Sequence, residues 1–267
     1  MTLSLTDPTL LKNACYIDGQ WVASDAGKAF PVYDPASGEV LAEVADLGAD
    51  ETRRAIEAAE RAMQDWKARP AKERANLLRK WYDLIMANQE DLAVLMTSEQ
   101  GKVLAESRGE IAYAASFIEW FAEEARRVYG DIVPLPQMDR RGVVIKQPVG
   151  VVGAITPWNF PAAMITRKAG PALAVGCTIV IKPAKETPLS ALALAELADR
   201  AGIPAGVINV VCGSSARTLG GAMTGKPRAR NLTFPGSTPV GKELVKQCAE
   251  TVKKVSMELG GNAPVIV

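Results

Sequence analysis

The sequence has 267 residues, of which 48% are hydrophobic and 23% are charged, and its formal net charge is +1. This composition is ordinary for a globular protein with a sizeable core, and it excludes the strongly basic surface that attracts nucleic acid or anionic membranes. The absence of histidine excludes Ser-His-Asp and Cys-His catalysis and histidine-ligated zinc, so we expect no metal site.

The amino-terminal residues and the cysteines predict the compartment. Residues 1–11 lack the basic and apolar segments of a signal peptide, and the longest nearly apolar run, residues 171–181, is too short to span a bilayer. No Cys-x-x-Cys pair occurs, which predicts free thiols in a reducing compartment. The cysteines are Cys15, Cys177, Cys212 and Cys248. We therefore expect a cytoplasmic protein.

The first 149 residues are predicted to form strands, then helices, then an arm. Two turn signals divide a strand-rich segment over residues 15–44. Apolar residues then recur at helical spacing, and a long helix is expected over 103–129. These apolar residues are Ile56, Ala59, Met63 and Trp66, followed by Leu77, Trp81 and Leu84. Over 130–149, two extended stretches flank a charged, proline-rich turn, which predicts an arm that pairs with a partner subunit.

From residue 149 onward, strands and helices alternate. The predicted strands are 149–155, 178–181, 207–211, 231–234 and 254–259, and the predicted helices are 160–175, 188–201, 216–223 and 239–250. This alternation predicts an α/β fold with a doubly wound parallel sheet. Ligands of such sheets bind beyond the carboxyl ends of the strands, where the polar candidates of this sequence lie. A last apolar strand is expected over 263–267, and because it lacks a polar end we expect the chain to be a fragment.

Two segments carry candidate catalytic groups. Residues 155–161 (ITPWNFP) place the amide of Asn159 on a turn after an apolar strand, where it could stabilise an oxyanion or simply satisfy its own backbone. Residues 257–261 (MELGG) place Glu258 between apolar neighbours and before two glycines. Burial there would raise the pKa of Glu258 and suit a general base, whereas a surface position would make it an ordinary acid.

Residues 234–242 (FPGSTPVGK) join a strand to a helix. Thr238 is the expected N-cap, and the free N–H groups of the helix can bind a phosphate. Gly236 would let that phosphate approach the backbone, and Ser237 could donate a hydrogen bond to it. The glycine spacing is not that of the dinucleotide fingerprint G-x-G-x-x-G, so a plain structural turn is the alternative.

Two lysines follow the strand over 178–181. Lys182 at the strand end could donate hydrogen bonds to ribose hydroxyls, and Lys185 stands where a cation would favour a ribose 2′-phosphate. Glu186 is adjacent in sequence but is expected to point the other way. The alternative is that both lysines are merely solvated.

Taken together, these segments resemble the aldehyde dehydrogenase superfamily over essentially the whole chain. The resemblance is most specific in residues 155–161, 182–188, 234–241 and 257–264, and residues 114–124 and 163–173 are most similar to its succinate-semialdehyde branch. It implies oxidation of an aldehyde to the acid, with NADP as the expected cofactor and NAD as the alternative. A cysteine thiolate attacks the aldehyde, hydride passes to the cofactor, and water hydrolyses the thioester.

The resemblance also implies roles for individual residues. Asn159 would stabilise the oxyanion, Glu258 would activate the water, and Arg167 would bind the substrate carboxylate, unless Arg167 is only a surface residue of its helix. The residues expected at the cofactor are Thr156, Pro157, Trp158, Lys182, Ala184, Lys185, Gly236, Ser237 and the Leu259 backbone. The full-length form is expected to be a homo-oligomer that acts on a small aldehyde.

Two departures from the family pattern affect these expectations. Pro235 stands where the family has threonine, which removes a hydroxyl and an N–H group near the nicotinamide. The family nucleophile lies beyond Glu258, and none of the four cysteines matches its motif. Without this nucleophile, we expect the chain not to turn over aldehyde. The expected units are amino-terminal strands and helices (1–129), an oligomerisation arm (130–149), a dinucleotide-binding domain (150–258) and the start of a truncated catalytic domain (259–267).

Two other functions can be compared with this expectation. A nucleotide-binding or scaffold protein that has lost the chemistry agrees with the missing nucleophile, but it gives no reason to retain Asn159 and Glu258. A short-chain dehydrogenase needs Tyr-x-x-x-Lys, and no tyrosine of this sequence is followed by lysine four residues later.

Overall fold

The structure is a computed structural model and describes residues 4–265. Within these residues, seven strands form a sheet in the order β11-β10-β7-β8-β9-β1-β2. The strands from β11 to β9 are parallel, and β1 and β2 extend the β9 edge in antiparallel register. Their bounds are β1 Cys15–Ile17, β2 Gln20–Val22, β7 Val151–Ile155, β8 Thr178–Lys182, β9 Ile208–Val210, β10 Ala229–Gly236 and β11 Lys254–Leu259.

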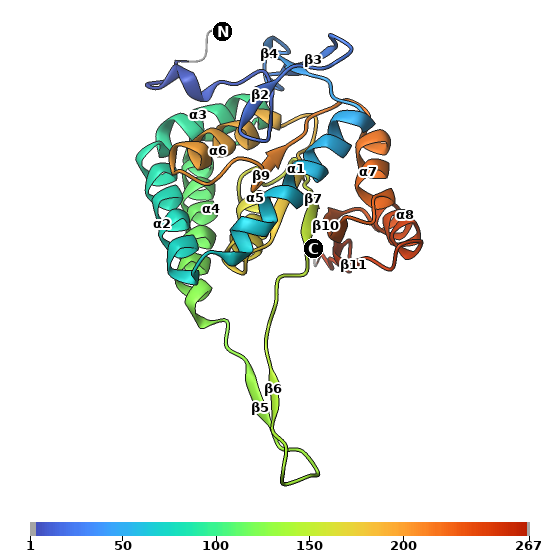
Figure 1. The fold of residues 1–267 in the computed structure, drawn as a ribbon. Coiled ribbons are helices and arrows are strands. Elements are labelled where there is room, and N and C mark those ends of the chain that lie inside the picture. The colour runs from blue at the N-terminus through green and yellow to red at the C-terminus, as the bar shows by residue number, and fades with distance from the viewer. Residues whose placement is uncertain (1–3, 266–267) are drawn as a thin grey trace.

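Helices cover both faces of this sheet (Figure 1). One group consists of α1 (Ala49–Ala68), α7 (Ala216–Gly225) and α8 (Thr238–Ala249), while α5 (Ala163–Ala174) and α6 (Pro188–Arg200) cover the opposite face. A further layer packs on α5 and α6 and consists of α2 (Ala71–Ala87), α3 (Gln89–Gln100) and α4 (Leu104–Glu124). The predicted doubly wound α/β fold is confirmed.

Buried strands and two tryptophans hold the layers together. Every residue of β7 and β8 is buried, as expected for strands covered on both faces. The indole N–H groups of Trp66 and Trp81 donate to the carbonyls of Leu173 and Leu194, each at 3.1 Å.

In α2 the buried face is rotated by one residue from the predicted one, because this helix packs against α4, α5 and α6 together. Leu78, Trp81 and Ile85 are buried, whereas the predicted Leu77 and Leu84 are only half-buried.

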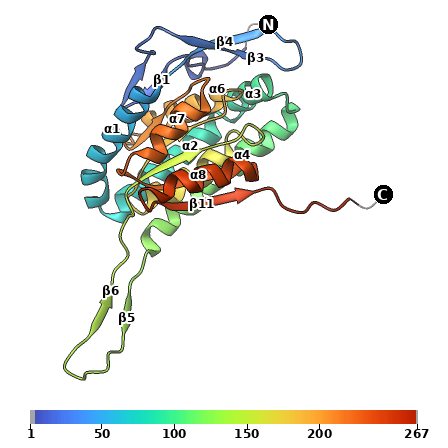
Figure 2. The same cartoon turned by 90° about the vertical axis from the view of Figure 1, so that its right-hand side faces the viewer.

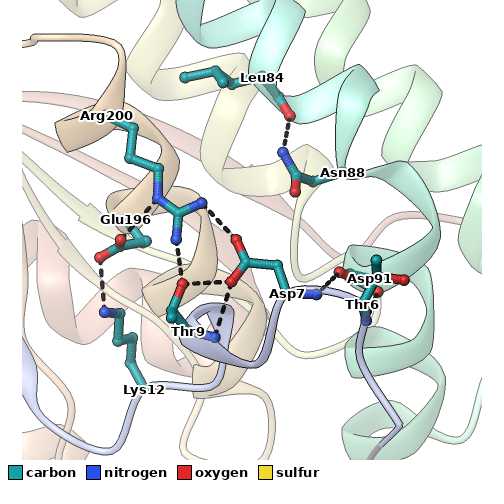
Figure 3. A network of polar contacts seen from close by, with 9 residues as sticks. All are labelled: Thr6, Asp7, Thr9, Lys12, Leu84, Asn88, Asp91, Glu196 and Arg200. Carbon is teal, nitrogen blue, oxygen red and sulfur yellow. Dashed lines mark hydrogen bonds and ion pairs between the residues drawn. The ribbon is translucent and has the colours of Figure 1, made fainter.

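The amino-terminal segment is tied to α3 and α6 by polar contacts (Figure 3). Asp7 accepts a hydrogen bond from Arg200 at 2.6 Å, and Arg200 also contacts Glu196, which pairs with Lys12 at 2.9 Å. The backbone N–H of Asp7 donates to the Asp91 carboxylate at 2.7 Å. After the short helix η1 (Pro8–Leu10), the chain enters the sheet, and then forms a separate hairpin of β3 (Ala29–Tyr33) and β4 (Val40–Ala45).

A two-stranded hairpin extends away from the body of the molecule (Figure 1 and Figure 2). It follows the short helix η2 (Ala125–Arg127) and pairs β5 (Asp131–Val133) with β6 (Gly142–Val144). Apolar side chains on it face solvent, and Ile132 is 80% exposed. The two strands of the predicted arm are present.

The last described residues differ from the expectation. Residues 263–265 form no strand and are exposed, so the strand predicted over 263–267 is wrong for this part, and residues 266–267 lie outside the described residues. Beyond β11 the chain runs out from the body with no neighbouring strand to supply hydrogen bonds (Figure 2).

Candidate cofactor and active site

A cleft of about 1020 Å³ opens beyond the carboxyl ends of β7, β8 and β10. Four of the residues predicted at a cofactor site line it, namely Thr156, Lys182, Ala184 and Lys185. Lys182 ends β8 and lies in register with Ile155 at the end of β7, and the Thr156 N–H donates to the Lys182 carbonyl at 3.0 Å. The parallel register therefore brings both segments to the same edge of the sheet.

The cleft contains two buried polar groups without partners. Lys182 is 5% exposed, and its ammonium has no hydrogen-bond or ion-pair partner within residues 4–265. Burial lowers its pKa, which the Glu186 carboxylate partly offsets. The Thr156 hydroxyl is also buried and makes no hydrogen bond in the described part of the chain. Unpaired buried donors are costly, so this cleft is suited to a ligand that supplies oxygen acceptors.

The segment between β8 and α6 forms one wall of the cleft. Lys185 and Glu186 are both exposed and both line it. Glu186 does not point the other way, because the segment turns tightly, with the Thr187 N–H bonded to the Ala184 carbonyl at 3.2 Å. A cation and an anion therefore stand side by side at the cleft.

The start of α8 forms another wall. Its N-cap is Ser237 rather than the predicted Thr238, which occupies the first helical position, and Ser237 makes no side-chain capping bond. Pro239 and Val240 line the cleft, whereas Gly236 and Ser237 do not. A Cβ at Gly236 would lie 2.4 Å from the Phe234 ring, so contact with this ring requires the glycine. The first N–H groups of α8 have no side-chain acceptor among the described residues, which leaves them open to an anion.

A smaller cavity of about 210 Å³ lies between α5 and the ends of β10 and β11. It brings together Arg167, Lys168, Pro235 and Glu258. Burial, with a smaller contribution from Arg167, lowers the pKa of Lys168 to about 8, and Glu258 opposes this shift. Lys168 was missed from the sequence, because a lysine on an amphipathic helix carries no signal beyond that of a solvated side chain.

The predicted catalytic pair lies on one edge of the sheet but not in one cavity. Asn159 is exposed on the turn after β7, Glu258 is near the end of β11, and β10 pairs in parallel with both strands. Neither cavity includes Asn159, whose backbone carbonyl accepts a hydrogen bond from Lys102 at 3.0 Å. Of the two alternatives for Glu258, the surface position is the one observed, because β11 is an edge strand and its Glu258 side chain is exposed.

The chain is similar in sequence to known enzymes over nearly its whole length. The model of the aldehyde dehydrogenase family matches residues 21–267. The chain belongs to this family. It is 62% identical to glutarate-semialdehyde dehydrogenase of Pseudomonas aeruginosa over 265 residues, which is 99% of this chain and 55% of that relative. It is 61% identical to the NADP(+) succinate-semialdehyde dehydrogenase of Escherichia coli, with the same two coverages.

The solved structures agree with the sequence relatives. The crystal structure of an NADP-dependent enzyme from E. coli superimposes with a TM-score of 0.97 at 61% identity, over 98% of this chain and 54% of that one. The chain thus spans about half the length of the curated relatives and of the structure that it matches. The resemblance to the aldehyde dehydrogenase family drawn from the sequence is confirmed.

The other residues that were predicted at the cofactor site do not line the large cleft. Pro157, Trp158 and Leu259 do not line it, and the Leu259 side chain packs against α8 at Gly241. Sequence reasoning in turn missed the part of the wall formed by α7 and α8. These residues include Ser214, Arg217, Glu243 and Gln247. Only Ser214 could have been found, because it follows β9 at the same sheet edge.

No thiol of the described chain faces either cavity. All four cysteines are free and buried, which confirms that they are unpaired. Burial raises the pKa of Cys177 and Cys248, and hydrogen bonding with Cys15 together with burial raises that of Cys212. Raised pKa values make these thiols weak nucleophiles at neutral pH.

The described residues contain neither a metal-binding cluster nor a membrane-spanning helix. Within residues 4–265, no group of three or more cysteine, aspartate or glutamate side chains is arranged to hold a metal ion. No helix of the described chain is both long enough and apolar enough to cross a membrane.

Proposed function

We propose that this chain forms the NADP-binding part of an aldehyde dehydrogenase that oxidises a semialdehyde to the corresponding dicarboxylic acid. The observation that carries the proposal is the cleft at the carboxyl edge of the sheet, in which the Lys182 ammonium and the Thr156 hydroxyl are buried without partners. Ribose hydroxyls would supply the acceptors that both groups lack. The residues present therefore fit a dinucleotide.

Residues in the cleft and beside it match the parts of the cofactor. Lys182 and Thr156 would hold a ribose, and the open N–H groups of α8 would hold the pyrophosphate. Lys185 would pair with a 2′-phosphate, which favours NADP over NAD, and the E. coli relative at 61% identity is named for NADP. Pro157, Trp158, Gly236, Ser237 and the Leu259 backbone would lie toward the nicotinamide end. When bound, the nicotinamide would accept the hydride from the substrate.

The smaller cavity would serve the substrate end. The Arg167 guanidinium is exposed beside this cavity, and its planar fork suits a carboxylate. The two relatives described above are named for glutarate semialdehyde and succinate semialdehyde, each of which carries a carboxylate opposite its aldehyde. Asn159 would donate to the oxyanion, and Glu258 would activate the hydrolytic water.

We further propose that the 267-residue chain does not itself turn over aldehyde. Its four thiols are buried and none faces the cavities, so none is placed to attack a substrate near Asn159. The same observation favours the second candidate, a nucleotide-binding or scaffold protein without catalysis. Both candidates require cofactor binding by this chain, and they differ in whether a longer protein supplies a nucleophile.

The assembly and location of the whole protein are separate proposals. The exposed apolar hairpin of β5 and β6 supports a homo-oligomer in which the hairpin pairs with another subunit. The composition and charge support a cytoplasmic location.

Titration calorimetry of the purified chain with NADP and with NAD tests the cofactor proposal. We expect both to bind and NADP to bind more tightly. Tighter binding of NAD would overturn the role of Lys185, and absence of binding by either would overturn the dinucleotide site. Stopped-flow absorbance at 340 nm with succinate semialdehyde and NADP tests turnover. A burst of NADPH would refute the proposed inactivity and exclude the non-catalytic candidate.

A further inference from the structure

Glu99, near the carboxyl end of α3, caps a helix that is distant in sequence. Its side chain is 3% exposed, and its two carboxylate oxygens accept hydrogen bonds from the backbone N–H groups of Leu189 at 2.7 Å and Ser190 at 2.8 Å. Both residues lie in the first turn of α6. One carboxylate thus satisfies two of the N–H groups that a helix leaves unpaired at its start.

This cap replaces the local one. The N-cap residue of α6 is Thr187, whose hydroxyl would ordinarily accept from the first turn. Its hydroxyl is instead buried and makes no hydrogen bond in the described chain. The start of α6 is therefore fixed by a side chain of α3, 90 residues away in sequence.

The capped turn lies directly after the segment that lines the large cleft. β8 holds this segment at Lys182, and α6 begins at Pro188. Ala184, Lys185 and Glu186 lie between these points and all line the cleft. We propose that Glu99 is a positioning residue that fixes the far end of this cofactor-binding segment. This inference rests on the proposed dinucleotide site.

The hold that Glu99 exerts depends on its charge. An ionised carboxylate offers acceptors to both N–H groups, whereas the carboxylic acid places a hydroxyl against one of them. No cation pairs with Glu99 in the described chain, and the titratable groups that face it are Glu110 and Cys212. Burial raises the pKa of Glu99 to about 7, so its charge changes within an accessible range of pH.

Asp91, also in α3, supplies a matched control. It is 5% exposed and accepts hydrogen bonds from the backbone N–H groups of Thr6 and Asp7 at 2.8 and 2.7 Å. It is therefore also a buried carboxylate of α3 that satisfies two backbone N–H groups distant in sequence. It holds the amino-terminal segment and makes no hydrogen bond with the segment between Lys182 and α6.

Titration calorimetry with NADP on wild type, Glu99→Gln and Asp91→Asn tests the inference. At pH 8.5 we expect Glu99→Gln to weaken NADP binding about tenfold, because one N–H group of the first turn loses its acceptor. Asp91→Asn should remain within about twofold of wild type, although thermal unfolding should show that both variants are less stable. At pH 6, where wild-type Glu99 is mostly protonated, the difference between Glu99→Gln and wild type should shrink to within about twofold.

NADP itself titrates in this pH range, and this affects wild type and variants equally. Ratios of Kd values measured at the same pH are therefore free of it. NADP binding by Glu99→Gln that matches wild type at pH 8.5, or equal weakening by Asp91→Asn, would overturn the inference. Failure of wild type to bind NADP would instead overturn the proposed function and this inference with it.

A second measurement needs no variant. Hydrogen exchange of the wild-type amides over residues 187–191 should show a loss of protection between pH 8.5 and pH 6, after correction for intrinsic rates. Unchanged protection would also overturn the inference.

Discussion

Replacement of Lys182 by methionine should stabilise the free chain and weaken cofactor binding. The Lys182 ammonium is buried at the end of β8 and has no partner in the described chain, so it loses its hydration without gaining a hydrogen bond. Methionine has a similar volume and length and carries no charge. The free chain should therefore gain about 1–3 kcal/mol, which corresponds to a rise in Tm of about 2–12 °C.

The same change removes the donor that a bound ribose would require. Loss of a hydrogen bond from a charged group costs about 1.5–3 kcal/mol, so the Kd for NADP should rise about 10- to 150-fold. Stability and affinity should thus move in opposite directions. A lysine kept only for the fold would instead lose stability on replacement.

The pH dependence gives an additional check. Burial lowers the pKa of Lys182 in the folded chain below its ordinary value of 10.5. The unfolded chain then binds the proton more tightly, so wild type gains stability as pH rises through the folded-state pKa toward 10.5. Lys182→Met lacks this gain, and its stability advantage should narrow as pH rises.

Urea unfolding at several pH values and calorimetry with NADP measure these quantities, and Lys185→Met is the control for unfolding. Lys185 is exposed, so its replacement should change the free energy of unfolding by less than about 0.5 kcal/mol. Destabilisation by Lys182→Met, or unchanged NADP affinity, would refute the reasoning.

Three further predictions concern groups away from the cleft. Glu110→Ala should cost about 3–5 kcal/mol in urea unfolding, because the half-buried Lys102 ammonium and the N–H groups of Ala162 and Ala163 at the start of α5 lose their buried partner; a loss below 1 kcal/mol would contradict this role of Glu110. Hydrogen bonds from Thr9 and Arg200 hold the pKa of Asp7 at about 2, below its ordinary 3.8. Its contribution to stability is complete above pH 3.8 and is lost as pH falls through 2, so Asp7→Asn should be less stable at pH 6 and approach wild type near pH 2; a gap independent of pH in urea unfolding would argue against the network. NMR titration of Lys168 should give a midpoint near pH 8, and Glu258→Gln should lower this midpoint, because Glu258 favours the charged ammonium. An unchanged midpoint would show that Glu258 does not interact electrostatically with Lys168.

Most of the sheet could be predicted from the sequence. The strands β7 and β8 are short apolar runs bounded by turn residues, and α6 ends at a glycine followed by proline, so local chemistry fixes their limits within a few residues. The rotated face of α2 could not be predicted, because it depends on which three helices pack against it. The pairing of β1 with β9 could not be predicted either, because it joins residues far apart in sequence.

The candidate site was predictable where it follows strand ends. Lys182 and Lys185 became candidates because the carboxyl ends of parallel strands meet at one edge, and Thr156 through the family resemblance; all three line the cleft. Glu258 was placed correctly on β11, but the sequence left its burial open, because apolar neighbours in sequence do not reveal an edge strand. Glu99 escaped prediction for a different reason, since a cap supplied by another helix leaves no motif at either residue.

The antiparallel addition of β1 to the sheet has a consequence for biosynthesis. Tyr16 pairs with Val210, and its hydroxyl donates to Asp199 at 2.6 Å across a separation of 183 residues. At ribosomal rates of about 5–20 residues per second, β1 emerges about 10 to 40 s before this partner exists. Cys15 and Tyr16, both buried in the finished protein, stay unsheltered for that interval. β1 is thus made long before its native neighbours, and until they appear its apolar side chains are open to a nascent-chain chaperone.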